Sequence, residues 1–515
     1  MAHPIAHLRR GLARNPDAIA IAGPGEAVSY ATLVAWVDAL AAAMQSLDPV
    51  PGSRVGICAR NTVEHLLALL ATYAAGKVWV PLNPRNGVAD LDRMIGATRP
   101  TLMVADELCL DRFSPTDAPL ILAKTVTGDG VRPTARGLID EWRGRVPSPV
   151  DHRDEDPQII KFSGGSTGAP KPVVQPLRCV NAQVDGIQSC FDLDAGDVNL
   201  IAAPLTHGAS CFVLPVLAAG GSHVLVEDPK PANVLDAIEQ YGVTTMYAPP
   251  TLIHGMLGDP SSRSRRYNAL RHLIYSAAPM RPDQIREAQR VFGPVVESAY
   301  GQVEAPQIVT AMRAADLEHD ENLTSIGRVS PVAEVAIFGT AGEQLPNGEV
   351  GEIGVRGPLV MSGYLDQPEL TAQTIVDGWL RTGDLGLIDE RGYVYIRGRL
   401  REVINSGGFK IFPGDVEAVL VRHPAVAECS AFGVPDEKWG EAITAAVRLR
   451  SDATAAELIA FVKVELGSVK APKSIHFVDD LPRNAAGKVS RADIRAAILA
   501  TSATMPEGRP YTDRV

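Results

Sequence analysis

The stretch Ile159-Ile-Lys-Phe-Ser-Gly-Gly-Ser-Thr-Gly-Ala-Pro-Lys171 decides how the rest of the chain is interpreted. An apolar run, predicted to form a strand, leads into a loop that concentrates three glycines, three hydroxyl side chains and a lysine. Glycine lets backbone N–H groups point inward at an anion, and the lysine adds positive charge. The pattern predicts a phosphate-binding loop whose contacts are Ser163, Gly164, Gly165, Ser166, Thr167, Gly168 and Lys171.

Two other motifs could explain the same residues, one that binds phosphate and one that carries a nucleophile. A Walker A loop has glycine directly before its lysine and serine or threonine after it, whereas Pro170 and Pro172 flank Lys171 here. Residues 164–168 also match G-x-S-x-G, the nucleophile elbow of α/β-hydrolases, which turns directly into a helix. The prolines suit such a helix poorly, so a serine hydrolase remains a minor alternative, beside an ordinary surface loop.

Composition narrows the class of protein. The chain has 515 residues, 46% of them hydrophobic and 21% charged, which predicts a globular protein of about three domains, or of one large and one small domain. The formal net charge of −11 argues against a nucleic-acid partner, because phosphate contacts need clustered lysine and arginine. The six cysteines form no C-x-x-C pair, which argues against a disulfide framework and a structural zinc site.

Membrane insertion is not expected from the apolar stretches. The N-terminus has no continuous apolar run of the kind that secretion signals carry. Residues 200–226 carry no formal charge, but prolines and glycines interrupt them and favour short buried strands over a spanning helix. We therefore expect no membrane span and a cytoplasmic protein.

The order of predicted elements indicates an α/β fold. Helical patterns from Pro231 and over 284–292 precede apolar strands at 243–248 and 295–299, an alternation that implies a largely parallel sheet covered by helices. Short alternating strands then follow at 334–338, 351–356 and 392–397. They predict a β-rich subdomain over about 330–398, within a large N-terminal domain of residues 1–398.

The remaining residues predict a smaller α+β domain. Helices are expected at 415–421 and 455–466, with Thr454 and Glu457 as a capping box, and strands near 426–432 and 443–449. We assign residues 402–500 to this C-terminal domain and 501–515 to a flexible tail.

Six further motifs follow in a fixed order, and with the loop they carry a resemblance. The sequence resembles the adenylate-forming family of acyl-CoA synthetases, luciferase and nonribosomal adenylation domains. In this family a carboxylate attacks the α-phosphate of Mg-ATP, giving an acyl-adenylate and pyrophosphate, and a thiol, usually of coenzyme A, then displaces AMP. The motifs are Pro204-Leu-Thr-His-Gly208, Ser276-Ala-Ala-Pro279, Tyr300-Gly-Gln-Val-Glu304, Arg381-Thr-Gly-Asp384, Gly398-Arg-Leu-Arg401 and Pro482-Arg-Asn-Ala-Ala-Gly-Lys488.

The resemblance implies roles for the nucleotide-binding residues. Asp384 is expected to accept the ribose hydroxyls and Arg399 to reach the sugar. Glu304 is expected to hold Mg²⁺, and Lys488 to contact the carboxylate and α-phosphate during adenylation only. The expected catalytic residues are Lys488, His207, Thr167 and Glu304. Further ATP or AMP contacts are expected from Ala277, Ala278, Pro279, Ser298, Ala299, Tyr300, Gly301 and Gln302.

The same resemblance implies where the acid and the thiol bind. The acid is expected beside His207, Gly208, Ala209, Ala277 and Gln302, where small residues leave space for a bulky aryl or alicyclic acid. Coenzyme A is expected along Gly407, Gly408 and Phe409. Residues 399–401, centred on Arg401, are expected to form a hinge that makes the C-terminal domain a mobile lid.

Departures from the family's pattern keep alternatives open. Val303 stands where relatives carry threonine, which removes one hydroxyl donor to the α-phosphate and predicts slower adenylation or a catalytically silent relative. Relatives that activate amino acids carry an acidic residue just after the position of His207, and this chain does not. We therefore disfavour amino-acid activation and expect a carboxylic acid and coenzyme A as the partners. An enzyme that loads a carrier protein is the main alternative, and a homodimer is left open.

Overall fold

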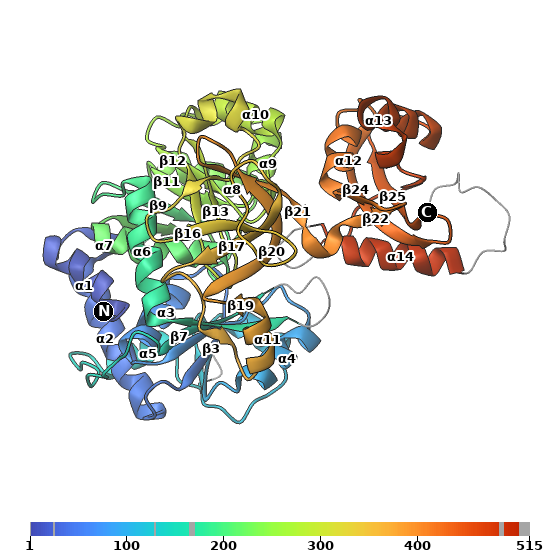
Figure 1. The fold of residues 1–515 in the computed structure, drawn as a ribbon. Helices are drawn as coiled ribbons and strands as arrows, with labels where there is room; N and C mark the ends of the chain where they lie inside the picture. Colours follow the sequence, from blue (N-terminus) through green and yellow to red (C-terminus); the bar gives the residue numbers. More distant parts are fainter. Residues whose placement is uncertain (1, 24–25, 128–129, 164–169, 484–488, 504–515) are drawn as a thin grey trace.

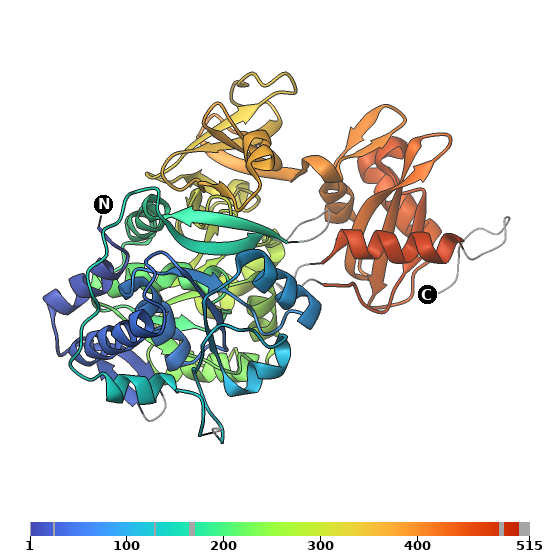
Figure 2. The same cartoon turned by 90° about the horizontal axis from the view of Figure 1, so that it is seen from below.

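The computed structural model describes residues 2–23, 26–127, 130–163, 170–483 and 489–503 as two bodies of unequal size (Figure 1). The larger body holds two sheets, and the smaller holds α12, α13, α14 and a sheet of its own. Figures 1 and 2 show the smaller body standing beside the larger one, joined to it through β21 (Tyr393–Arg399) and the short helix η5 (Leu400–Glu402).

The first sheet runs through the whole larger body. Its strands from β1 to β13 pair in parallel apart from the β1–β2 hairpin, and antiparallel pairs follow from β13 to β16. The order across the sheet is β16 (Glu334–Phe338), β17 (Gly351–Arg356), β20 (Trp379–Ile388), β21, β15 (Gly327–Val329), β14 (Thr310–Met312), β13 (Val296–Tyr300), β12 (His272–Tyr275), β11 (Thr245–Ala248), β9 (Val198–Ile201), β10 (Ser222–Leu225), β1 (Ile19–Gly23) and β2 (Glu26–Ser29), with β19 (Ile375–Val376) beside β20.

The predicted β-rich subdomain is therefore not a sheet of its own. Strand β15 pairs with β14 on one side and with β21 on the other, so its hydrogen bonds continue the parallel sheet into the antiparallel part. The strands expected at 334–338 and 351–356 are confirmed as β16 and β17, and the third lies at β21. Local alternation predicted the strands, but pairing between distant strands decided which sheet they join.

The second sheet carries the predicted phosphate loop. It is parallel from β6 to β7 and antiparallel from β7 to β18. Its order is β18 (Gly363–Tyr364), β8 (Lys171–Pro176), β7 (Pro157–Ser163), β4 (Val78–Pro81), β3 (Arg54–Cys58), β5 (Leu102–Ala105) and β6 (Leu120–Leu122).

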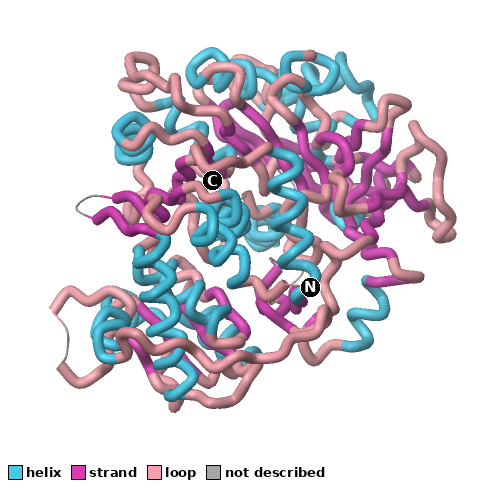
Figure 3. The backbone as a smooth tube through the Cα atoms, turned by 90° about the vertical axis from the view of Figure 1, so that its left-hand side faces the viewer, coloured by secondary structure: helices cyan, strands magenta, loops and turns pink. Residues whose placement is uncertain are grey.

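Helices cover the strands of the larger body (Figure 3). Capping side chains mark several starts: Ser29 accepts the backbone N–H of Thr32 at α2, and Thr62 accepts that of His65 at α3. The helices are α1 (Ile5–Arg14), α2 (Tyr30–Leu47), α3 (Val63–Ala74), α4 (Val88–Thr98), α5 (Ala135–Glu141), α6 (Leu177–Phe191), α7 (Val213–Ala219), α8 (Pro231–Gln240), α9 (Pro250–Gly258), α10 (Pro282–Phe292) and α11 (Pro368–Thr374), with the short η1 (Glu107–Arg112), η2 (Gly208–Phe212), η3 (Asp316–Glu318) and η4 (Asp320–Asn322).

Helix α2 is the one helix in the described part of the chain that is long and apolar enough to cross a membrane. In the fold 61% of this stretch is buried, and it packs on α3 in the main core. The uncharged residues 200–226 form β9, η2, α7 and β10 instead of one long helix.

The smaller body follows the sequence prediction closely. Its helices are α12 (Pro413–Leu420), α13 (Ala455–Lys470) and α14 (Arg491–Ala503), and the Thr454–Glu457 capping box is present. Its strands are β23 (Phe409–Ile411), β22 (Ile404–Ser406), β25 (Gly440–Leu449), β24 (Val426–Asp436) and β26 (Ser474–Phe477). Helix α14 continues to Ala503, three residues into the stretch assigned to the tail.

Candidate active site

The motifs gather at one end of the parallel strands. Residues 204–208 follow β9, residues 276–279 follow β12, and Tyr300 ends β13. Parallel strands place their carboxyl ends at the same edge, where α/β folds bind ligands. The sequence motifs are thus brought together by topology, although they lie about a hundred residues apart.

Asp384 organises this edge. Its side chain is 5% exposed and has three partners, which come from two segments of the chain. Tyr300 Oη and Gln302 Nε2 both donate to Asp384 Oδ2 at 2.6 Å, and Arg399 Nε lies 3.0 Å from Oδ1. Strand pairing sets Asp384 directly opposite Arg399 in the β20–β21 ladder. Burial and the neighbouring Asp384 carboxylate raise the pKa of Tyr300, which keeps its hydroxyl a donor.

The predicted phosphate loop is closed by a hairpin. Ser163 at the end of β7 pairs with Lys171 at the start of β8, while residues 164–169, which include Gly164, Gly165, Ser166, Thr167 and Gly168, lie outside the described residues. Strand β8 is thus the next described element after β7 and its antiparallel partner. A nucleophile elbow needs a helix after its serine, so this geometry argues against the hydrolase.

Lys171, Tyr364 and Glu304 form a second polar group beside the hairpin. The Lys171 ammonium lies 5.4 Å from the centre of the Tyr364 ring, and Tyr364 Oη donates to Glu304 Oε1 at 3.0 Å. The described residues hold no cluster of three histidine, cysteine or carboxylate ligands. Glu304 suits Mg²⁺ as a single carboxylate ligand, because this ion binds through one or two carboxylates plus substrate phosphates.

Strained backbone marks the same edge. Ala277 has φ +75°, and Gln307 and Ile308 have φ +25° and +92°, values that side chains other than glycine rarely adopt. Gly301 has no room for a side chain, since a Cβ there would lie 2.5 Å from the backbone nitrogen of Gln307. Packing therefore fixes the loop that carries Gln302 and Glu304.

His207 lies after β9 with its ring Nδ1 2.9 Å from Thr206 Oγ1. The surrounding protein atoms, and then the charges of Lys161 and Arg85, lower the pKa of His207 to about 4. The residue nevertheless keeps an exposed surface. A neutral imidazole thus faces solvent at this edge at pH 7.

The space expected beside His207 is partly filled. A Cβ on Gly208 would lie 2.5 Å from the Tyr247 hydroxyl, so Tyr247 occupies the room that the glycine leaves, and Ala209 is buried. Ser298 and Ala299 are also buried within β13, whereas Ala277 and Pro279 are exposed and Ala278 is half-buried. Of this group, residues 277–279 are the ones with solvent-accessible side chains.

The expected coenzyme A segment is a tight hairpin in the smaller body. Gly407 and Gly408 join β22 to β23 with φ of +59° and +83°, the conformations of a two-residue turn, and Phe409 is 58% exposed. Arg401 lies in η5, and its charge reaches the Tyr364 hydroxyl. Lys488 lies outside the described residues.

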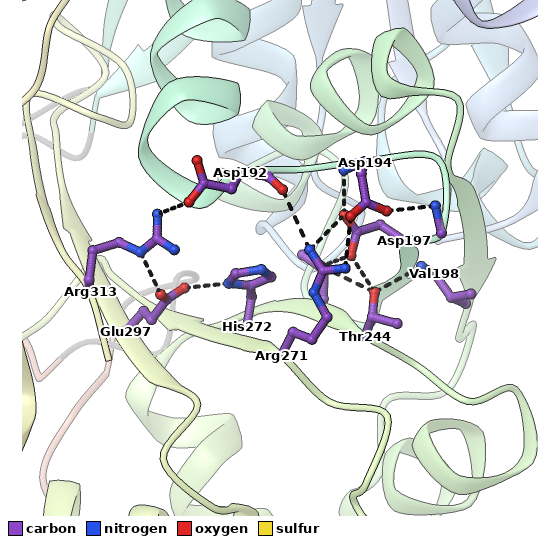
Figure 4. Close-up of polar contacts among 11 residues, drawn as sticks. Asp192, Asp194, Asp197, Val198, Thr244, Arg271, His272, Glu297 and Arg313 are labelled. Carbon is purple, nitrogen blue, oxygen red and sulfur yellow. Dashed lines mark hydrogen bonds and ion pairs between the residues drawn. The ribbon is translucent and has the colours of Figure 1, made fainter. Parts of the chain in front are cut away.

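The opposite edge of the first sheet holds a separate polar network (Figure 4). Glu297 accepts from His272 Nδ1 at 2.8 Å and pairs with Arg313 at 3.0 Å, and Arg271 pairs with Asp194 at 2.9 Å. These residues lie where strands β12 and β13 begin and β14 ends. The network ties the strands together away from the motifs, so its role is structural.

Lys161, which no sequence motif indicates, lies beside His207 and is only 8% exposed. Its Nζ donates to Ser210 Oγ at 2.9 Å and to the His207 carbonyl at 3.3 Å. The available signal was a lysine at an inward position between the apolar residues of a buried strand.

Comparison with known proteins shows the family of the chain. Residues 8–365 match the family model described as AMP-binding enzyme, and residues 415–488 match that of the AMP-binding enzyme C-terminal domain. The chain is 36% identical over 475 residues to a medium/long-chain-fatty-acid–CoA ligase of Mycobacterium tuberculosis, covering 88% of this chain and 83% of that one. It is 34% identical over 496 residues to a feruloyl-CoA synthase of an Amycolatopsis species, covering 93% and 96%.

Solved structures share the fold over nearly the whole chain. An amide bond synthetase, McbA from Marinactinospora thermotolerans, has a TM-score of 0.86 at 30% identity, covering 96% of this chain and 100% of that one. ATP-bound MatB from Rhodopseudomonas palustris has a TM-score of 0.86 at 29% identity, covering 96% and 98%. The o-succinylbenzoate CoA synthetase MenE from Bacillus subtilis, in complex with ATP and a magnesium ion, has a TM-score of 0.80 at 25% identity, covering 94% and 98%. The chain therefore belongs to the AMP-binding enzyme family, the adenylate-forming superfamily, and within it is most like the acyl-CoA synthetases.

Proposed function

We propose that this chain is an ATP-dependent, AMP-forming ligase that joins a carboxylic acid to coenzyme A. One observation carries the proposal: the buried Asp384 carboxylate collects donors from Tyr300, Gln302 and Arg399 at the carboxyl edge of the sheet. A fixed carboxylate with two oxygens suits the two hydroxyls of a ribose, which supports the proposal. The CoA-ligase relatives and the ATP-bound structural neighbour support it.

The first half-reaction forms the acyl-adenylate. A carboxylate oxygen of the acid attacks the α-phosphorus of ATP, and pyrophosphate leaves. Asp384 and Arg399 hold the sugar, residues 277–279 and Tyr300 line the base, and Lys171 offsets phosphate charge. Because the reactants are all anions, positioning and charge compensation account for most of the catalysis.

Glu304 is the proposed Mg²⁺ ligand, with one oxygen held by Tyr364 and the other available to the ion. Bound Mg²⁺ neutralises phosphate charge and makes pyrophosphate a better leaving group. Thr167 and Lys488 complete the proposed adenylation contacts.

The second half-reaction transfers the acyl group. The coenzyme A sulfur attacks the acyl carbon, AMP leaves with the electron pair of the broken C–O bond, and the thiol gives up its proton. The exposed Gly407–Gly408 turn is the proposed path of the pantetheine arm, since a turn without side chains lets it pass close to the backbone. Neutral His207 flanks the acid without adding charge.

The test is release of AMP from ATP with a panel of carboxylic acids, with and without coenzyme A. We expect CoA-dependent AMP release and an acyl-CoA product. Glu304→Gln should raise the Mg²⁺ concentration needed for half-maximal rate, while Glu349→Gln, at an exposed residue, should not. Turnover that needs no ATP, or AMP release that no acid stimulates, would contradict the proposal.

A further inference from the structure

Lys161 occupies a position that a buried strand normally gives to an aliphatic side chain. Alternation along β7 places Ile159 and Lys161 on the same face, and Ile159 belongs to the main core with Trp79. The Lys161 ammonium lies 5.1 Å from the centre of the Trp79 ring. Burial lowers the pKa of Lys161, which means that the surrounding protein disfavours its charge.

Lys161 forms no ion pair with any carboxylate in the described part of the chain. Lys77 is the instructive contrast, since it is also buried but lies 3.2 Å from the Asp48 carboxylate. Two of the three Lys161 N–H groups are used, by Ser210 Oγ and the His207 carbonyl. A buried cation without a counter-ion destabilises a protein, so the residue needs a reason outside folding.

A small cavity adjoins the ammonium, and its lining combines polar and apolar side chains. Its lining includes Lys161, Trp79, Gln183, Ser210 and Tyr73 among apolar side chains. The Trp79 indole N–H is buried and finds no partner among the described residues. The Ser210 hydroxyl hydrogen is already given to the His207 carbonyl at 2.8 Å. In the described part of the chain, the third N–H of Lys161 and the indole N–H of Trp79 therefore form no hydrogen bond.

The size and place of the cavity indicate what it takes. The volume open to the centre of a water molecule is about 10 Å³, which corresponds to about one water. That space suits one oxygen of an end group and not a whole acid. Lys161 and Ser210 also bind the carbonyl of His207, so the cavity lies directly behind the proposed acid site.

We propose that Lys161 determines specificity by binding an oxygen at the far end of the acid, so that the substrate carries a carboxylate, keto or hydroxyl oxygen remote from its reacting carboxyl group. Unsubstituted fatty acids and plain aryl acids would leave the ammonium unpaired and are disfavoured. This inference rests on the proposed ligase activity and names the class of acid that it uses.

The test compares matched acids in wild-type protein and in Lys161→Met, which keeps a side chain of similar length without charge. Each set shares one chain length or ring and differs only at the far end, which is a methyl group, a keto or hydroxyl group, or a carboxylate. We expect wild type to favour an oxygen-bearing member by about tenfold or more in kcat/KM, mainly through KM, since a hydrogen bond to a charged group contributes about 1.5–3 kcal/mol.

In Lys161→Met, kcat/KM for the oxygen-bearing acids should fall about tenfold more than kcat/KM for the methyl-ended acid, which removes the preference. The substitution should also raise the melting temperature of the free protein, whereas Lys77→Met, which leaves Asp48 without its cation, should lower it. A wild-type preference for methyl-ended acids, or an equal loss on all acids in Lys161→Met, would overturn the inference.

Failure of the ligase proposal can be distinguished from failure of the inference about Lys161. If no acid supports AMP release, thermal stabilisation of the two proteins by the same acids in the presence of ATP decides the matter. Stabilisation by oxygen-bearing acids that is lost in Lys161→Met supports the cavity assignment, and equal stabilisation of both proteins contradicts it.

Discussion

Asp384 concentrates the chemistry of the nucleotide site in one residue. A buried carboxylate with a tyrosine hydroxyl, an amide N–H and a guanidinium around it is held in one orientation before any ligand arrives. Such preorganisation reduces the entropy lost on binding. The orientation of the carboxylate, and not its charge alone, should therefore control ATP affinity.

Asp384→Asn tests this directly. The amide keeps one acceptor oxygen but turns an N–H₂ group toward donors of Tyr300, Gln302 or Arg399. We expect ATP affinity, measured by titration calorimetry, to fall about 10–100-fold, because hydrogen bonds to charged groups contribute about 1.5–3 kcal/mol. Asp389→Asn, at the other end of the same pair of strands, is the control. Equal affinity in both variants would remove Asp384 from the nucleotide site.

Val303→Thr probes the departure from the family's motif. Val303 is half-buried and packs against the core that includes Val173 and Ala305, while its carbonyl accepts from Gln175 Nε2 at 2.8 Å. A threonine hydroxyl that reaches the α-phosphate should speed adenylation by no more than about tenfold. Pyrophosphate exchange measures this rate. A large loss of soluble, folded protein instead would show that the side chain serves packing only.

At the scale of elements, the two edges of the first sheet carry different kinds of residues. The carboxyl ends carry the motifs and the strained residues, and the amino ends carry the network of Figure 4. Buried polar contacts between the strands then fix the distances on which the motifs depend.

His223 joins two of these strands and predicts a pH dependence. Its Nδ1 faces the Asn199 side-chain amide at 3.1 Å, and its Nε2 lies 3.1 Å from the Val213 carbonyl, so the ring is buried with every nitrogen used. Burial lowers its pKa from 6.5 to about 4. Between these values the unfolded chain binds a proton that the folded chain does not, so stability falls as the pH falls from 6.5 to 4.

His223→Gln should flatten this part of the stability profile. The effect to be removed is about 3 kcal/mol at pH 4, since each pKa unit corresponds to 1.36 kcal/mol. The measurement is the midpoint of thermal unfolding at a series of pH values. The same substitution at exposed His254 is the control, and a profile that both variants leave unchanged would mean that His223 is not the group responsible.

Sequence patterns predicted individual elements better than their contacts. The strands β7, β16 and β17 and the capping box of α13 depend on local residue order, which is visible in the chain. The ladder that sets Asp384 opposite Arg399, the filling of the space at Gly208 by Tyr247 and the burial of Lys161 depend on pairing between distant segments. Local periodicity carries no information on such pairings.

At the scale of the whole molecule, groups from both bodies are proposed to act at the same acyl carbon. Lys488 and the Gly407–Gly408 turn both belong to the smaller body, yet the proposed chemistry needs them in different half-reactions. A rotation about η5 would bring each to the site in turn, with the few residues of the link absorbing the change in φ and ψ.

Lys488→Ala and Arg401→Pro should therefore impair different half-reactions. Loss of the Lys488 charge should slow acyl-adenylate formation but spare thioester formation from supplied acyl-adenylate. Proline fixes φ near −65° at Arg401, so that variant should keep pyrophosphate exchange and lose CoA-dependent turnover. Both half-reactions are measured on one preparation of each variant. Normal CoA-dependent turnover in Arg401→Pro would place the pivot elsewhere or remove the need for rotation.

The central claim is that an acid oxygen attacks the α-phosphate of ATP, and the fate of that oxygen tests it most directly. An acid labelled with ¹⁸O at both carboxyl oxygens is turned over with ATP and coenzyme A, and the masses of the products are measured by mass spectrometry. Attack at the α-phosphorus followed by C–O cleavage leaves one labelled oxygen in AMP and one in the acyl-CoA, and the account predicts this result. Unlabelled AMP, or label in pyrophosphate or inorganic phosphate, would contradict it.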